Sequence, residues 1–210
     1  MMTLLRASAT HLQGESSGCP TTACHHVRRM SSLEGQLLVA SPALADPNFA
    51  RTVVAIANHD AEGALGIVLN RPSETEVADA VPELADVTDG DEVVYVGGPV
   101  QPASIVVLAE FADPASAAYL VVDGIGLVSD QVGLEGLDDA TQRRRIFAGY
   151  AGWGPGQLEA ELEREDWIIE PAQADDVFCD DPEELWGLVL ERKGGQFRLL
   201  ARMPQDPTVN

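Results

Sequence analysis

A glycine-rich segment with two aromatic side chains, Gly149–Gly156, has the spacing best suited to holding a ligand. It leads into a helix predicted over 157–164, and exposed N–H groups at the start of a helix attract anions. Its glycines would let a ligand approach the backbone, and the rings of Tyr150 and Trp153 could stack on an aromatic group. The segment therefore predicts contact with a small anionic or aromatic ligand. The alternative is a tight turn in which both rings pack as core anchors.

Gly152 and Gly154, within this segment, do not belong to a nucleotide-binding fingerprint. Gln157 occupies the position at which a dinucleotide-binding loop needs its third glycine, and no Walker A lysine is present. The sequence also lacks the nucleophile-elbow and zinc-protease motifs. We therefore predict no catalytic residue and no cofactor.

Asn70 and Arg71 are polar residues at the end of an apolar run. An arginine at the end of a strand can bind a carboxylate or a phosphate through two parallel hydrogen bonds. Gly97 and Gly98 could bring backbone amides near the same place. Two alternatives stay open: a salt bridge from Arg71 to one of the many carboxylates, and a turn at Gly97–Gly98 that needs a positive φ.

His59 and Cys179 are the two other reactive side chains that follow residue 29. Asp60 stands beside His59 and suggests a catalytic dyad, but adjacent residues of an extended segment point to opposite faces. We predict that His59 is a hairpin-loop residue. Cys179 has no histidine nearby in the sequence, and we predict a structural role for it.

Metal binding is not predicted. Four possible zinc ligands form a C-x₄-C-H-H pattern near the start of the chain: Cys19, Cys24, His25 and His26. This spacing is not that of a zinc finger. Three acidic pairs are expected in solvated loops: Asp138–Asp139, Asp175–Asp176 and Asp180–Asp181. None has the glycine-turn spacing of a calcium loop.

The elements that must position these residues are short strands and a few helices. Strands are predicted over 36–41, 52–58, 64–70, 93–96, 104–111, 117–122, 143–148 and 166–170, and helices over 73–84, 157–164 and 182–192. The strand-like runs do not alternate cleanly, so both faces of the sheet should be covered. Ser73 and Glu76 form a capping box that favours a helix beginning at Ser73.

The lead Met1–Arg29 differs from the rest of the chain. It has no apolar periodicity, and its early apolar stretch is too short for a secretory signal. Met30 begins a segment that resembles the start of a chain. We predict a disordered or untranslated lead over 1–29 and one domain over 30–210, in which the single cysteine fits a reducing cytosol.

The charge balance restricts the possible partners. The 34 acidic residues against 13 basic ones give a formal net charge of −21. Nucleic acids and anionic membranes repel such a surface, whereas a protein partner remains compatible with it. No apolar run is long enough for a transmembrane helix. We expect a soluble, cytoplasmic protein, and the sequence predicts no oligomeric state.

Four separate segments resemble the signature segments of the bacterial YqgE/AlgH family. They are LLVASPALADPNFARTVV (37–54), GALGIVLNRP (63–72), VGGPV (96–100) and GYAGWGPGQLEAEL (149–162). They occur in the family's order, and the resemblance extends from about Leu33 to the C-terminus. Ser73 departs from the leucine that usually follows the NRP segment.

The resemblance implies a single mixed α/β domain with a strongly curved mixed sheet flanked by helices, in bacterial cytoplasm. It implies no reaction and no catalytic residue. Many family members carry the label of transcriptional regulator through a link to alginate production.

Three functions remain in competition at this point. The first is a non-catalytic binding or regulatory protein that holds a small anionic or aromatic ligand near Asn70, Arg71, Tyr150 and Trp153. The second is an enzyme acting on a small phosphorylated metabolite through His59 and Arg71. The third is a transcriptional regulator acting through DNA or a protein partner, although neither a helix-turn-helix pattern nor a basic face supports contact with DNA.

Overall fold

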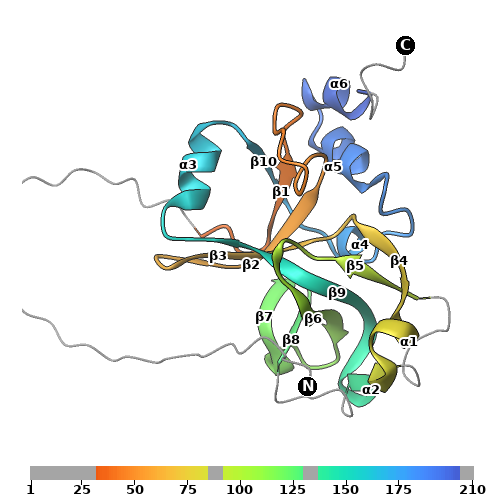
Figure 1. Ribbon diagram of the computed structural model, residues 1–210. Coiled ribbons are helices and arrows are strands. Elements are labelled where there is room, and N and C mark those ends of the chain that lie inside the picture. Colours follow the sequence, from red (N-terminus) through yellow and green to blue (C-terminus); the bar gives the residue numbers. More distant parts are fainter. Residues whose placement is uncertain (1–31, 85–91, 130–136, 204–210) are drawn as a thin grey trace, which may run out of the picture.

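The computed structural model describes residues 32–84, 92–129 and 137–203 (Figure 1). Its strands are β1 (Gln36–Ala40), β2 (Val53–Asp60), β3 (Gly63–Val68), β4 (Pro72–Glu76), β5 (Val93–Val96), β6 (Val100–Phe111), β7 (Ala117–Val122), β8 (Ile125–Val128), β9 (Thr141–Trp153) and β10 (Trp167–Pro171). Its helices are α1 (Val77–Ala80), α2 (Leu137–Ala140), α3 (Gln157–Glu163), α4 (Ala174–Val177), α5 (Leu185–Lys193) and α6 (Phe197–Ala201), with short 3₁₀ turns η1 (Pro82–Leu84) and η2 (Pro114–Ser116). Within these residues, no helix has the length and apolar character needed to cross a bilayer.

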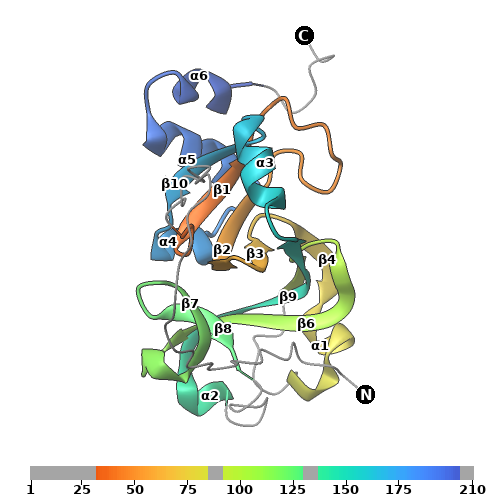
Figure 2. The ribbon, with the colours of Figure 1, turned by 90° about the vertical axis from the view of Figure 1, so that its left-hand side faces the viewer.

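The strands form one sheet in the order β10-β1-β2-β3-β9-β6-β8-β7, and β4 and β5 form a branch beside β9. The pairing between β5 and β9 is parallel, and the other strand pairs are antiparallel. Figure 2 shows β6 and β9 bending across the middle of the molecule, so that β1, β2 and β10 lie on one side of the bend and β7 and β8 on the other. The structure thus confirms a mixed α/β fold with a strongly curved mixed sheet.

Both faces of β1 and β2 are buried, as their apolar runs predict. Val53 and Ala55 belong to a core cluster that includes Trp186 on α5, whereas Val54 and Ile56 belong to a second cluster with Leu158 on α3. This alternation follows from the two-residue period of a strand. Helices α5 and α3 therefore cover opposite faces of the same strands.

The helix predicted over 73–84 is wrong in its first part. Residues Pro72–Glu76 form β4, which pairs with β5, and the α-helix begins only at Val77. The Ser73 hydroxyl accepts a hydrogen bond from the Thr75 N–H at 3.1 Å, a local turn contact rather than a helix cap. The capping-box residues lie on a strand because pairing with a distant segment outweighs their local preference for a helix.

Strand β9 is much longer than the predicted strand over 143–148. It runs to Trp153, so the first half of the glycine-rich segment is part of the sheet and not a loop. Along its length, β9 pairs with β5 up to Ala148 and with β3 from Ala151 onward. Between them, Gly149 has φ +71°, a left-handed conformation that costs glycine little. Gly149 therefore lets β9 bend where its partner strand changes.

Candidate functional site

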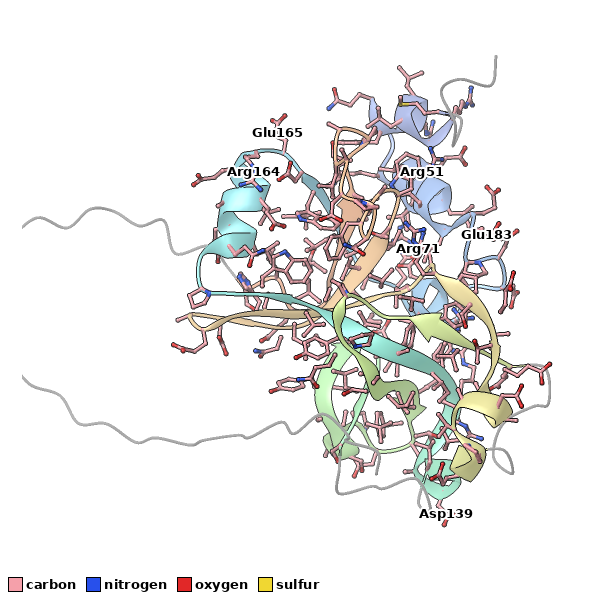
Figure 3. All side chains as sticks on the ribbon, viewed as in Figure 1. Arg51, Arg71, Asp139, Arg164, Glu165 and Glu183 are labelled. Atoms are coloured by element: carbon pink, nitrogen blue, oxygen red, sulfur yellow. The ribbon has the colours of Figure 1, made fainter. Side chains whose placement is uncertain are left out.

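A pocket of about 460 Å³ lies between the loop that follows β1, the junction of β3 with β4, and the segment before α5. We call it the arginine pocket; it is lined by Pro47, Ala50, Arg51, Asn70, Arg71, Pro72 and Glu183. In Figure 3, Arg51, Arg71 and Glu183 lie together beside α5, whereas Arg164 and Glu165 lie at α3, away from them. The pocket thus brings together residues from three separate parts of the sequence.

Asn70 builds one wall of this pocket. Its side chain is 7% exposed, Oδ1 accepts a hydrogen bond from the Val53 N–H at 2.9 Å, and Nδ2 donates to the Arg51 carbonyl at 2.9 Å. Both ends of the amide are thus used to hold the loop that carries Arg51. Asn70 is a positioning residue in this structure, and the polar group available to a ligand has to come from its neighbours.

Arg71 supplies such a group. Its Nη2 donates to the Ala50 carbonyl at 2.7 Å, and no ion pair joins Arg71 to any residue in the described part of the chain. A guanidinium has five N–H donors in a planar fork, so one bond to a carbonyl leaves most of its donors available. Arg71 therefore brings a cation and several hydrogen-bond donors to the pocket.

Arg51 is the second cation of the arginine pocket. Its backbone has φ +56°, its guanidinium lies 4.1 Å from the centre of a Trp186 ring, and its Nη1 donates to the Met203 carbonyl at 3.0 Å. Burial lowers the pKa of Arg51 below its usual value, and the nearby Glu184 carboxylate opposes that shift. An arginine remains protonated in proteins, so both guanidinium groups are positive.

A second pocket, of about 410 Å³, lies over the end of β9 and the hairpin between β2 and β3. It is lined by Asn58, Asp60, Glu62, Gly63, Ala64, Leu65, Val100, Tyr150, Gly152 and Trp153. The Glu62 N–H hydrogen bond lowers the pKa of the Asp60 carboxyl, with help from Asn58. The ligand residues predicted from the sequence are thus divided: Asn70 and Arg71 line the arginine pocket, and the Tyr150–Trp153 group lines this acidic one.

Trp153 is used mainly inside the fold. It is 6% exposed, its ring stacks on Phe49 with centroids 6.2 Å apart, and Trp167 meets it edge-on at 6.0 Å. The Trp153 Nε1–H donates to Glu161 Oε2 at 2.8 Å, and the Trp167 Nε1–H donates to the same oxygen at 2.8 Å. The Gly154 N–H is bonded to the Gln157 side chain at 3.1 Å. These contacts favour the core-anchor interpretation of this segment over stacking on a ligand.

Gly97 and Gly98 allow β9 to pass close by. The Gly97 N–H donates to the Ala148 carbonyl at 2.9 Å, and the Gly97 carbonyl accepts from the Val68 N–H at 2.9 Å. A Cβ atom at Gly97 would lie 2.3 Å from the Gly149 carbonyl oxygen, and one at Gly98 would lie 2.2 Å from the Tyr150 carbonyl carbon. Their small size serves strand packing, and neither lines the two pockets described here.

His59 lies in β2 and not in the hairpin loop, so that prediction is wrong. The turn is shorter than expected, because His59 pairs with Ala64 and the strand continues to Asp60. The ring is buried: Nδ1 accepts from the Leu33 N–H at 3.1 Å, and Nε2 lies 3.0 Å from Glu159 Oε1. An accepting Nδ1 places the ring proton on Nε2, which donates it to Glu159. His59 lines neither pocket.

Cys179 and the acidic pairs contribute no metal centre. The Cys179 thiol is half-buried and donates to the Asp181 carbonyl at 3.2 Å. Across residues 32–84, 92–129 and 137–203, no three His, Cys, Asp or Glu side chains are placed to share a metal ion. Cys19, Cys24, His25 and His26, with the lead 1–29, lie outside the described residues.

Two lining residues of the arginine pocket, Arg51 and Glu183, were missed by the sequence reasoning. Arg51 follows the turn cluster 46–49. Basic residues are scarce in this acidic chain, and that scarcity is the one signal that could have singled out Arg51. Glu183 comes from more than a hundred residues further along the chain, and no local pattern connects it with Arg71.

Comparisons with known proteins agree on one family. The AlgH-like family model matches residues 37–198. A UPF0301 protein of Streptomyces coelicolor is 46% identical over 187 residues, which cover 86% of this chain and 97% of the relative. A UPF0301 protein of Mycolicibacterium smegmatis is 40% identical over 195 residues, covering 90% of this chain and 94% of that relative.

Two solved structures have a similar fold. The crystal structure of a protein from Corynebacterium diphtheriae matches with a TM-score of 0.72 and 29% identity, over 81% of this chain and 92% of that one. The solution structure of the AlgH protein from Pseudomonas aeruginosa matches with a TM-score of 0.64 and 29% identity, over 90% of this chain and 100% of that one.

Proposed function

This chain belongs to the AlgH-like family, and on that premise we propose that it is a non-catalytic binding protein of the bacterial cytoplasm that holds a small anion between Arg51 and Arg71. One observation carries the proposal: two arginines, Arg51 and Arg71, line the same pocket of about 460 Å³ in a chain whose formal net charge is −21. In such an acidic chain, two arginines at one pocket form a local region of positive charge. Its complement is a carboxylate or a phosphate.

The wall of the pocket supports the same ligand class. Asn70 fixes the carbonyl of Arg51, and Arg71 holds the carbonyl of Ala50, so the loop 50–51 is tied to the end of β3 by two side chains. Groups held in place before binding lose little freedom when the ligand arrives. Glu183 at the edge of the pocket would accept a hydrogen bond from a hydroxyl or an ammonium group of the ligand and would disfavour a second negative charge there.

Binding is favoured over catalysis by the chemistry of the lining. The pocket is bounded by Pro, Ala, Arg, Asn and Glu, and the histidine that an enzyme mechanism would need is bonded to Leu33 and Glu159 elsewhere. Arginine holds anions well and transfers protons poorly, because it does not lose its charge at physiological pH. The aromatic part of the predicted ligand site drops out of this proposal, because the rings line the other pocket.

Two measurements test the proposal. The native mass of the purified full chain is first compared with its denatured mass, and a retained anion appears as an excess that denaturation removes. Calorimetric titration with inorganic phosphate and with citrate then compares wild type with R71Q. We expect R71Q to bind at least about tenfold more weakly, since a hydrogen bond to a charged group contributes about 1.5–3 kcal/mol.

R164Q is the matched control. Arg164 is exposed, pairs with Asp166 at 2.7 Å, and lies at α3 away from the pocket (Figure 3). Its loss should leave anion affinity unchanged. Equal affinities for wild type and R71Q, or a loss in R164Q of the same size, would show that the anion does not use the arginine pocket.

A further inference from the structure

Exposed apolar side chains concentrate at the C-terminal helices. Among the described residues, five large apolar side chains are strongly exposed, and three of them belong to this region: Leu188 on α5 at 51%, Leu199 on α6 at 72%, and Met203 just after α6 at 44%. Figure 1 shows α6 at one end of the molecule, beyond α5 and away from the sheet. We use the name α6 face for Arg198, Leu199, Arg202 and Met203.

The fold itself explains which side of α6 is outside. Phe197, Leu200 and Ala201 pack against the core cluster that contains Trp186 and Val189. Leu199 of α6 and Met203, which follows the helix, take no part in this packing and are exposed. Helix α6 is thus apolar on its inner side and again on its outer side. The inner side has its partner in the core, and the outer side has none among the described residues.

The charges on the α6 face indicate what fits it. Arg198 and Arg202 are exposed and form no ion pair with a described residue, and α6 contains no acidic side chain. The nearest basic residues on α5 differ, because Arg192 is paired with Asp176 at 2.7 Å and Lys193 with Glu170 at 3.2 Å. The Arg198 Nε–H donates to the Glu191 backbone carbonyl at 3.5 Å, a contact that does not neutralise its charge.

We propose that the α6 face docks an acidic, amphipathic segment of a partner protein. The apolar side chains of that segment cover Leu199 and Met203, and its carboxylates meet Arg198 and Arg202. A symmetric dimer through this face would place the same arginines against each other, which is unfavourable. An anionic membrane surface is opposed by the net charge of −21. An acidic protein segment satisfies both the apolar and the charged part of the face.

The proposal does not depend on the arginine pocket. Arg51 binds the Met203 backbone carbonyl, and no side chain of the α6 face lines the arginine pocket. The match to the family model ends at Arg198, so Leu199, Arg202 and Met203 lie beyond the matched residues. Variants that test the face therefore avoid Arg51 and Arg71.

Site-specific photo-crosslinking tests the docking in the chain's native cells. A benzoyl-phenylalanine replaces Leu199 in the full chain, and a matched variant carries the same group at Leu120, which is 49% exposed on β7 at the other end of the sheet. After irradiation, the joined peptides are mapped by mass spectrometry. We expect the group at 199, and not the one at 120, to join a segment of another protein that is rich in Asp and Glu beside apolar residues.

The double variant R198E/R202E decides whether charge selects the partner. When the double variant also carries benzoyl-phenylalanine at position 199, the crosslink should be lost. A synthetic peptide of the mapped segment should bind the purified double variant at least about tenfold more weakly than wild type, because two attractive contacts become repulsive. An unchanged thermal midpoint for the variant shows that the loss is not a folding defect. The variant R164E, which reverses an exposed charge just after α3, should bind the peptide as wild type does.

Other results overturn the proposal. A crosslink from 199 to a second copy of this chain would assign the face to self-association, and a crosslink to lipid would assign it to a membrane. Joined peptides without acidic residues, yields at 199 no higher than at 120, or a crosslink that survives R198E/R202E would each show that no acidic segment docks there.

Discussion

The end of β9 and the arginine pocket differ in how fully the protein itself hydrogen-bonds their polar groups. At the end of β9, Glu161 accepts from both indole N–H groups and Gln157 accepts from the Gly154 N–H, so the chain satisfies its own donors. In the arginine pocket, Arg71 donates one hydrogen bond to the Ala50 carbonyl and lines the open pocket. A buried polar group without a partner is costly, whereas an exposed one is available. The two regions thus differ in whether their hydrogen-bond donors remain available to a ligand, and not in the types of residue that they contain.

This comparison explains why the glycine-rich segment misleads when only its sequence is considered. Glycine and tryptophan are found at ligand sites, yet they also serve where strands approach closely and where large rings fill a core. The segment Gly149–Trp153 uses them in the second way. The following variants test the comparison, beginning with the largest expected effect.

Trp153→Ala should lower the free energy of unfolding by about 3–5 kcal/mol, because it removes a buried ring from the cluster with Phe49 and Trp167. Urea unfolding followed by circular dichroism measures it. Tyr150→Ala is the companion variant, and its half-buried ring should cost less. A Trp153→Ala protein of nearly wild-type stability would break the comparison and return Trp153 to the ligand residues.

Glu161→Ala should lower the free energy of unfolding by about 2–4 kcal/mol, because two indole N–H groups lose their acceptor. Glu163→Ala on the same helix is the control. Its side chain is exposed, so the expected change is below about 0.5 kcal/mol. If both variants unfold alike, the double acceptor at Glu161 is not what stabilises this end of β9.

Asn70→Ala should cost about 1–3 kcal/mol, because the buried Val53 N–H loses its acceptor and the loop carrying Arg51 loses a tie. Anion affinity should also fall, but by less than in R71Q, since Asn70 acts on the ligand only through Arg51. A larger loss of affinity for Asn70→Ala than for R71Q would mean that Asn70 touches the anion itself.

Asp60→Asn should have the smallest effect, about 0.5 kcal/mol or less, because Asp60 is exposed. The Glu62 N–H bond lowers the pKa of Asp60 in the folded state. A lowered pKa means that the contribution to stability is present above the unfolded value of about 3.9 and is lost as the pH falls through the folded value. The stability difference between wild type and Asp60→Asn should therefore vanish at low pH, and a constant difference would contradict this assignment.

Strands and helices whose own residues carry a clear pattern could be predicted from the sequence. The β-branched runs at 52–58 and 64–70 became β2 and β3, and the helix predicted over 182–192 became α5. The errors arose where distant pairing decides. Ser73 and Glu76 have helix signals but lie on a strand paired with β5, and Gly149–Trp153 extends β9 because β3 lies beside it.

The candidate site was predicted in part for the same reason. Arg71 was recognised because a polar residue ended an apolar run. Arg51 and Glu183 were not, because the pocket that joins them exists only after the loop after β1 and the segment before α5 come together. Likewise, no sequence periodicity could show that both nitrogens of the His59 ring would be hydrogen-bonded, one to Leu33 and the other to Glu159.

The shared carboxylate of Glu161 also has an optical consequence. It holds Trp153 and Trp167 with ring centroids 6.0 Å apart and planes at 78°, a geometry in which two transition dipoles couple and produce a paired signal in far-ultraviolet circular dichroism. The third tryptophan, Trp186, lies apart under the Arg51 guanidinium. The coupled pair reports the integrity of the β9 end, and Trp186 takes no part in that signal. An unlabelled sample can therefore be read at the end of β9 by its own chromophores.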